Sequence, residues 1–380
     1  MPKGPLWEGR RILPSKNFNI NNHLIGVRDL DRHAELRKPW NKAFGTGPLK
    51  DYEEMLLSRA GLLASRLEEL CDQAAAQGDF NAKVDLAEWA SFFAFDFMGD
   101  IAFTVDFRLL KDGDVNNFVK DMEDAQRLPT IVQHVPWLAR ITRATPFISN
   151  KMRAFAVDPN FTASPLPIII ANSVLAILAG SDTTSSALAT TFYSLLRHPE
   201  CYKQLQKEID EVCSEDGGCG DPLPSPDRLA QLPYLNAVVF LPEGTNVQVP
   251  PYVLHRDPSA SASSSSDSKS QGRSSSSEES DSASVSSSDA EDSPSGATTG
   301  TSVVHEKNAF IPFSTGPANC AGKPLALMEL RYVIALLVRK FDLDFQEDFD
   351  VEGWENTLTD RLTMCRGPLL VNLRKRKVVS

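Results

Sequence analysis

The chain lacks two features that would place it at a membrane or on a nucleic acid. Its longest apolar stretch, 165–180, is interrupted by Asn172 and Ser173 and is shorter than the roughly 20 residues that a membrane helix needs. Its 39 basic residues are outnumbered by 50 acidic ones, and one short basic run lies near the C-terminus, at 374–377. We therefore expect no membrane span and no nucleic-acid partner.

The chain also lacks the cysteine patterns of a zinc site or a disulfide framework. Its six cysteines include no C-x-x-C pair, and no histidine is spaced as a zinc ligand. A chain of 380 residues can bury a sizeable core without disulfides. Residues 1–11 are polar, are broken by Gly and Pro, and do not resemble a signal peptide. These absences favour a reducing compartment such as the cytoplasm.

Aromatic residues are missing from the segment 259–302, in which 21 of 44 residues are serine. Seven acidic and two basic residues give this serine tract a net charge of −5, out of −11 for the whole chain. Such a composition cannot bury enough apolar surface to offset the entropy lost on ordering the backbone. We therefore predict a disordered insert. The other 336 residues would suit one large domain or two average ones.

Helical periodicity dominates the rest of the chain. Apolar residues recur at three- and four-residue intervals over 51–76 and predict a long helix. A second helix is predicted over 84–103, with a set of aromatic residues in the core: Trp89, Phe92, Phe93, Phe95, Phe97 and Phe103. Further helices are predicted over 165–197, 200–212, 232–239 and 323–341. The expected fold class is mainly α with a small β portion.

A stripe of small residues marks the predicted helix 165–197. Ala176, Gly180, Thr183 and Ala187 share one face, where a flat, bulky group could approach the backbone. The hydroxyl of Thr183 could take a backbone carbonyl from its usual partner and open a local bulge for water. The neighbouring Asp182 needs a partner or water inside an apolar helix. The alternative is close helix packing at Gly180, with Asp182 on a solvated edge.

A second constellation is the loop 313–322, which leads directly into a helix. Cys320 lies just before the helix N-terminus, where unpaired amide groups and the helix dipole favour thiolate over thiol. Gly316 and Gly322 permit tight turns and the approach of a planar partner, and Phe313 could shield the sulfur. This pattern is typical of a metal-ligating thiolate. A buried structural cysteine is the alternative.

Together these segments resemble the cytochrome P-450 superfamily of haem-thiolate monooxygenases. Residues 313–322 match its F-x-x-G-x-x-x-C-x-G pattern and residues 179–184 match [AG]-G-x-[DE]-T-[TS], in the family's order. Shorter segments resemble its fungal microsomal members, at 33–44, 196–200, 242–245 and 255–258. The resemblance covers roughly 4–258 and 305–371, and it implies the cytochrome P-450 fold.

The resemblance also implies a cofactor, a partner and a set of residues. The residues that would hold haem b are the iron ligand Cys320 with Phe313, Gly316, Gly322, Trp40 and Arg37, the last two at a propionate. Asp182 and Thr183 would be catalytic and would guide protons to dioxygen, while Ala179 and Gly180 would leave space for it. Electrons would come from NADPH through NADPH-cytochrome P-450 reductase, and the substrate would be a small apolar molecule. The family is expected at the endoplasmic reticulum membrane, although we identify no anchor in this sequence.

The sequence departs from the family pattern beside the cysteine loop. The E-x-x-R pair belongs on the helix predicted at 232–239, which passes into Phe240-Leu241-Pro242 without either residue. The serine tract replaces the segment that would lock onto that pair. We also expect the family's N-terminal sheet region to be missing. The fold is thus predicted as one incomplete domain, formed by 1–258 and 303–380 and interrupted by 259–302.

Three hypotheses follow from these observations. The chain is a monooxygenase with haem-thiolate chemistry, or it is a truncated or mis-spliced family member without haem. In the third, it is an interaction protein that acts through its acidic serine tract, phosphorylated at sites such as Ser275 with Glu278 nearby.

Overall fold

A computed structural model describes most of the predicted helices and both predicted site segments. The described residues are 24–25, 27, 29–124, 166–215, 223–239, 312–314, 316–361 and 363–376. The serine tract, the motifs at 242–245 and 255–258, and the chain between 125 and 165 lie outside them.

Helices dominate the described residues, as the sequence predicted. The α-helices are α2 (Leu30–Ala43), α3 (Thr46–Ala76), α4 (Leu86–Phe103), α5 (Leu109–Asp112), α9 (Leu166–Arg197), α10 (Pro199–Glu215), α11 (Pro226–Leu229), α12 (Pro233–Val239) and α15 (Lys323–Lys340). Two short 3-10 helices are η3 (Gly316–Ala318) and η4 (Trp354–Thr357). The strands are β1 (Ala82–Asp85), β2 (Phe341–Phe345), β3 (Thr359–Arg361), β4 (Thr363–Cys365) and β5 (Leu370–Lys375).

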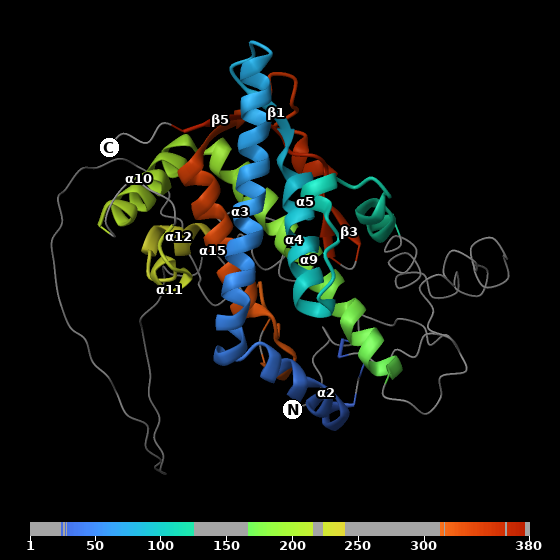
Figure 1. The fold of residues 1–380 in the computed structure, drawn as a ribbon. Helices are drawn as coiled ribbons and strands as arrows, with labels where there is room; N and C mark the ends of the chain where they lie inside the picture. Colours follow the sequence, from blue (N-terminus) through green and yellow to red (C-terminus); the bar gives the residue numbers. More distant parts are fainter. Residues whose placement is uncertain are drawn as a thin grey trace, which may run out of the picture.

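Four long helices form the body of the molecule. Helix α3 lies beside α4 and α15, and α9 packs against α4 along an extensive interface (Figure 1). The close approach of α4 and α9 depends on Gly180, because a Cβ atom there would lie 2.6 Å from Met98 Sδ. The hydroxyl of Ser181 donates to the Ala94 carbonyl across the same interface at 3.2 Å. The two helices therefore pack almost backbone to backbone at this point.

The aromatic face of α4 is confirmed in part. Four of its residues are buried: Phe92, Phe93, Phe95 and Phe97. Trp89 is half-buried. The prediction was wrong for Phe103, which is 43% exposed at the last residue of the helix, just before Thr104 turns into the left-handed region with φ 54°. The end of the helix projects beyond the packed interface. Its final side chain is therefore more exposed to solvent than the side chains of the earlier turns.

The start of this helix was also predicted too early. Residues 82–85 form β1, which pairs with β5 in the register Val84↔Val371. The carboxylate of Asp85 accepts the Ala87 amide at 3.0 Å and caps α4. A distant strand and a side-chain cap therefore place the boundary at Leu86.

Two small sheets complete the described fold. Strands β1, β5 and β2 form an antiparallel sheet in that order, so the chain's C-terminal strand pairs with a strand from its first quarter. Strands β3 and β4 form a hairpin that pairs Thr359 with Cys365. This hairpin contacts α9 and carries residues into the candidate site.

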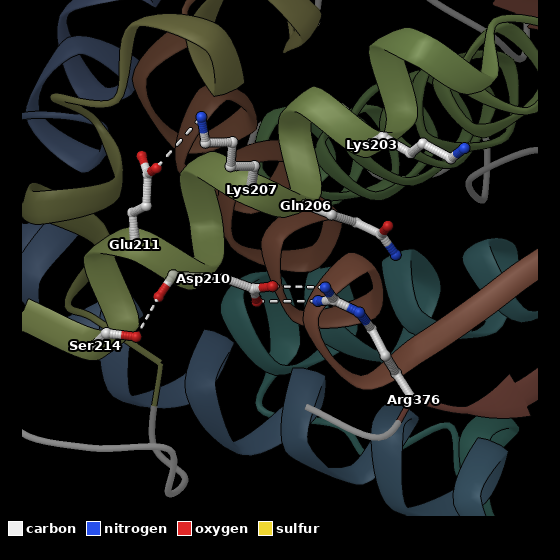
Figure 2. A pocket seen from close by; sticks show the side chains of 7 residues that line it. All are labelled: Lys203, Gln206, Lys207, Asp210, Glu211, Ser214 and Arg376. Carbon is white, nitrogen blue, oxygen red and sulfur yellow. Dashed lines mark hydrogen bonds and ion pairs between the residues drawn. The ribbon is translucent and has the colours of Figure 1, made fainter. Parts of the chain in front are cut away.

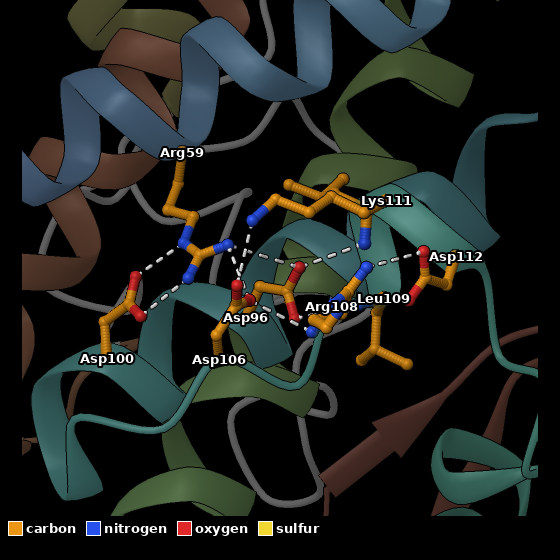
Figure 3. Close-up of polar contacts among 9 residues, drawn as sticks. Arg59, Asp96, Asp100, Asp106, Arg108, Leu109, Lys111 and Asp112 are labelled. Atoms are coloured by element: carbon orange, nitrogen blue, oxygen red, sulfur yellow. Dashed lines mark hydrogen bonds and ion pairs between the residues drawn. The ribbon is translucent and has the colours of Figure 1, made fainter.

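A charged cluster fastens α3 to the end of α4. Arg59 of α3 donates to Asp100 Oδ2 at 2.5 Å and lies 3.0 Å from Asp106 Oδ1 (Figure 3). The fully buried Asp96 accepts the amides of Leu109 and Leu110 at 3.1 and 3.0 Å. One guanidinium thus neutralises carboxylates from α4 and from the turn that leads to α5.

Candidate functional site

The loop ahead of α15 brings Phe313 next to Cys320. The Cys320 amide donates to the Phe313 carbonyl at 2.9 Å, which closes the loop. Two residues in the left-handed region allow this fold-back: Ser314 at φ 59° and Gly316 at φ 75°. The expectation that Gly316 permits a tight turn is therefore confirmed by its conformation. Cys320 itself is exposed rather than a buried structural cysteine.

The electrostatics of the thiol differ from the prediction. Burial raises the pKa of Cys320, although the amides of Gly322 and Lys323 and the charge of Arg37 act in the opposite direction. Protein atoms crowd around the sulfur even though the residue keeps an exposed surface. The expected preference for thiolate was thus wrong for the protein by itself, because desolvation outweighs the helix N-terminus. A bound cation would reverse the balance, since a coordinating thiol is deprotonated.

Arg37 of α2 holds the residue that precedes the cysteine. Its Nη1 donates to the Asn319 carbonyl at 2.5 Å and its Nη2 to Asn319 Oδ1 at 2.8 Å. Its third nitrogen, Nε, donates to Asn41 Oδ1 at 2.8 Å within α2. The cysteine loop therefore has a brace from α2, which the sequence did not reveal. The predicted contact of Arg37 with a haem propionate stays a prediction.

Trp40 points to a different element from Arg37. Its indole Nε1 donates to Asn172 Oδ1 of α9 at 3.3 Å, and the Leu24 amide donates to the same oxygen at 3.3 Å. In the sequence, Asn172 is distinguished only by its place inside an apolar run. A polar residue inside such a run was the available signal, and the structure shows that it ties α2 to the first half of α9.

Three consecutive residues of α9 reach three different partners. Asp182 is only 5% exposed, and Thr363 Oγ1 of β4 donates to its Oδ2 at 3.4 Å. Thr183 is exposed, and its hydroxyl donates to the Ala179 carbonyl at 2.5 Å. Thr184 is buried and donates to the carboxyl group of Glu329 on α15.

These contacts decide between the alternatives for the small-residue stripe. Close packing at Gly180 is confirmed, because the Met98 side chain fills the adjacent space. A solvated edge for Asp182 is wrong, since the side chain is buried against the β3–β4 hairpin. The hydroxyl of Thr183 does bond the predicted carbonyl, but α9 stays a continuous α-helix without a bulge. The roles of Ala179 and Gly180 toward dioxygen stay predictions.

Arg366 anchors the hairpin that touches Asp182. Its Nη2 donates to the Ala87 carbonyl and to Ser91 Oγ of α4, both at 2.7 Å, and its Nη1 to Ser186 Oγ of α9 at 3.1 Å. Burial lowers the pKa of Arg366, and the nearby Asp182 carboxylate acts in the opposite direction. No sequence motif singles out Thr363 or Arg366, since both lie outside the motifs identified above.

A hollow along the described residues lies on another part of the molecule. Its volume is about 570 Å³, and it is lined by Lys203, Gln206, Lys207, Asp210, Glu211, Ser214 and Arg376. Its charges largely pair with one another, with Asp210 turned toward Arg376 and 2.5 Å from it (Figure 2). None of the predicted site residues lines this hollow. A polar surface of paired charges does not suit a small apolar substrate.

Metal-binding clusters and membrane-spanning helices are both absent from the described residues. No three His, Cys, Asp or Glu residues in these parts of the chain come together in a way that could hold a metal ion. Within the same residues, no helix is both long and apolar enough to span a membrane.

The described fold is mainly helical with two small sheets, and comparisons identify its family. The family model for cytochrome P450 matches residues 10–157, 167–240 and 298–369. The chain therefore belongs to the cytochrome P450 family. The serine tract falls almost wholly within the unmatched stretch between the second and third segments.

Known relatives and a solved structure agree with this assignment. Tryprostatin B 6-hydroxylase of Neosartorya fischeri is 29% identical over 95% of this chain and 70% of that protein. Cytochrome P450 monooxygenase sthD of Phaeosphaeria nodorum is 28% identical over 92% of this chain and 78% of that protein. The crystal structure of the cytochrome P450DA heme domain covers 98% of this chain and 82% of its own, with a TM-score of 0.61 at 18% identity. That structural likeness confirms the cytochrome P450 fold.

Proposed function

We propose that the chain is a haem-thiolate monooxygenase that uses dioxygen to hydroxylate or otherwise oxidise a small apolar organic molecule. The observation that carries this proposal is the loop of Cys320, which precedes α15 and is braced at Asn319 by Arg37. The names of the fungal relatives, a hydroxylase and a monooxygenase among them, support the same reaction class.

The residues around Cys320 fit a haem. A single exposed cysteine offers one sulfur ligand, and the amides of Gly322 and Lys323 favour its thiolate form. A Cβ atom built on Gly322 would meet only Phe44, at 3.9 Å, and one on Gly316 would meet nothing within 4 Å. The backbone on this side of the loop is therefore open to a flat partner. When bound, haem would supply an iron centre whose thiolate ligand favours cleavage of the dioxygen bond.

The chain's own residues would manage the proton supply. The hydroxyl of Thr183 donates its hydrogen bond to the Ala179 carbonyl. The lone pairs of the hydroxyl oxygen therefore stay available to accept a hydrogen bond from a water molecule. Asp182 keeps an ionisable group one residue away, held by Thr363. We assign proton delivery to this pair, space for dioxygen to Ala179, and a propionate contact to Arg37. Electrons would come from NADPH through a reductase partner.

The reduced, CO-bound spectrum of the full chain tests this function. The protein is purified with added haem, reduced under CO and compared with the oxidised form. A thiolate-type shift of the Soret band is expected, because the site offers sulfur and no described second ligand. A band typical of a haem with nitrogen or oxygen ligation, or no haem at all, would refute the proposal.

Replacing Arg37 by leucine is expected to weaken haem retention by about 10–100-fold, the usual cost of removing a group that orients a metal ligand. The variant loses both hydrogen bonds to Asn319, so the cysteine loop is no longer held from α2. Retention is measured as the haem concentration that half-saturates the CO-bound band.

Arg32 provides a matched control on the same helix. It pairs with Glu35 at 3.0 Å, and both side chains are exposed, so Arg32→Leu should leave haem retention unchanged. Equal retention by Arg37→Leu and the wild-type protein would show that the brace does not matter. An Arg37→Lys variant, which lacks the planar fork, should fall between the two.

A further inference from the structure

Glu329 of α15 is a carboxylic side chain in a place where an ionised carboxylate is poorly accommodated. It is 1% exposed and lies nine residues beyond Cys320. One of its carboxyl oxygens accepts a hydrogen bond from the hydroxyl of Thr184 in α9. Its Oε2 atom has no hydrogen-bond partner among the described residues. Buried carboxylates are normally paired with a cation or with several N–H donors.

No such compensation is present in the described surroundings of Glu329. Burial raises the pKa of its carboxyl group to about 8, and only the hydrogen bond from Thr184 acts in the opposite direction. The described helices packed against α15 are α3, α9, α10, α11 and α12, and none of them sets a charged side chain against this group. Desolvation therefore decides the protonation state.

The Glu329–Thr184 hydrogen bond joins the two helices that carry the proposed chemistry. Thr184 directly follows Asp182 and Thr183 in α9, while α15 begins three residues after Cys320. One helical turn further on, Leu188 of α9 and Val333 of α15 line the same small apolar void, so the contact continues as core. Among the described residues, this bond is thus a polar link beside an apolar part of the α9–α15 contact.

We propose that Glu329 is an uncharged carboxylic acid and a positioning residue, which through Thr184 sets α9 in register with α15. It thereby places Asp182 and Thr183 relative to the cysteine loop. The purpose of that placement rests on the function proposed above. The uncharged state of Glu329 and its bond to Thr184 do not, and they are tested without haem.

The first experiment compares wild-type protein with Glu329→Gln, which is uncharged and nearly isosteric. Urea unfolding of the full chain is followed from pH 5 to pH 8. The folded state holds the Glu329 proton more tightly than the unfolded chain, in which the pKa is near 4.5. Wild-type stability is therefore fully present below pH 4.5 and falls relative to the variant until about pH 8.

The expected relative change in the unfolding equilibrium constant between pH 5 and pH 8 is on the order of 10²-fold. An infrared band of a protonated carboxyl group should also be present in wild-type protein at pH 7 and absent from Glu329→Gln. Parallel pH curves for the two proteins would overturn the proposal, because they would mean that the carboxyl group is ionised or hydrated.

The second experiment tests positioning with a double-mutant cycle. Glu329→Leu, which cannot accept a hydrogen bond, and Thr184→Val are combined, and their effects on unfolding at pH 6 should fail to add, because each removes the same bond. Thr190 is a matched control, since it is buried in α9 and donates to the Ser186 carbonyl instead. Thr190→Val and Glu329→Leu should be additive. Additivity for Thr184 as well would overturn the link.

A third measurement tests whether the Glu329–Thr184 bond affects the proposed monooxygenase reaction. In protein loaded with haem and supplied with NADPH and reductase, Thr184→Val should divert a larger share of electrons to hydrogen peroxide, whereas Thr190→Val should not. An unchanged share in Thr184→Val would refute the positioning role. If wild-type protein lacks the thiolate-type spectrum, the proposed function fails, yet the pH and double-mutant results still decide the state of Glu329.

Discussion

Cys320→Ala is expected to abolish the thiolate-type Soret band of the reduced, CO-bound protein and any monooxygenase activity with it. Cys320 is the cysteine of the braced loop, with its amide bonded to Phe313 and two further amides favouring the thiolate. Alanine offers no ligand for an iron atom. Because coordination is all or none, the expected effect is complete loss rather than a graded one.

Cys201→Ala is the control for this variant. Cys201 is half-buried on α10, away from the loop, and its removal should leave the Soret band at full intensity. Circular dichroism of both variants verifies that the helices are retained. A thiolate-type band that persists in Cys320→Ala would place the iron ligand elsewhere in the chain, and equal loss in both variants would indicate general misfolding.

Arg59→Leu is expected to lower the free energy of unfolding by about 3–5 kcal/mol, the range seen when one partner of a buried ion pair is removed. The side chain of Arg59 is 11% exposed and serves Asp96, Asp100 and Asp106. Without it, carboxylates from α4 and the following turn repel one another, and the buried Asp96 loses its cation. Urea denaturation, with the change in midpoint converted at constant slope, measures the effect.

The exposed pair of Arg32 and Glu35 again supplies the comparison. Arg32→Leu removes an ion pair whose members are 44% and 62% exposed, and it should cost no more than about 1 kcal/mol. Similar losses in the two variants would show that the Arg59 cluster is no stronger than a surface pair. The cluster matters for the site because α4 carries Met98 and Ala94, against which α9 is packed.

Local periodicity predicted the long helices well. The expected helix at 51–76 lies within α3, and the one at 165–197 corresponds to α9 with a start one residue later. Prediction failed at 84–85, where β1 takes the residues that were assigned to a helix. That strand exists because β5 pairs with it almost 290 residues later in the chain, and no local pattern contains this information.

Motifs likewise indicated the reactive residues but not their support. The sequence singled out Cys320, Asp182 and Thr183, and it lacks the E-x-x-R pair that the family pattern has at 232–239. The structure shows a different support for the loop, in which Arg37 bonds Asn319 across 282 positions of sequence. A brace of this kind needs only a side chain that reaches the loop in space, so a missing motif does not prove that support is missing.

By itself, the sequence determined the family, the helical class of the fold and the types of reactive group, because these depend on residue identity and short-range spacing. Tertiary structure decided the burial, the hydrogen-bond partners and the pKa of each group. It buried Asp182 against Thr363, gave Glu329 a single hydroxyl partner, and raised the pKa of the Cys320 thiol. Burial and long-range contacts set the cost of charge, and these arise only when distant segments pack together.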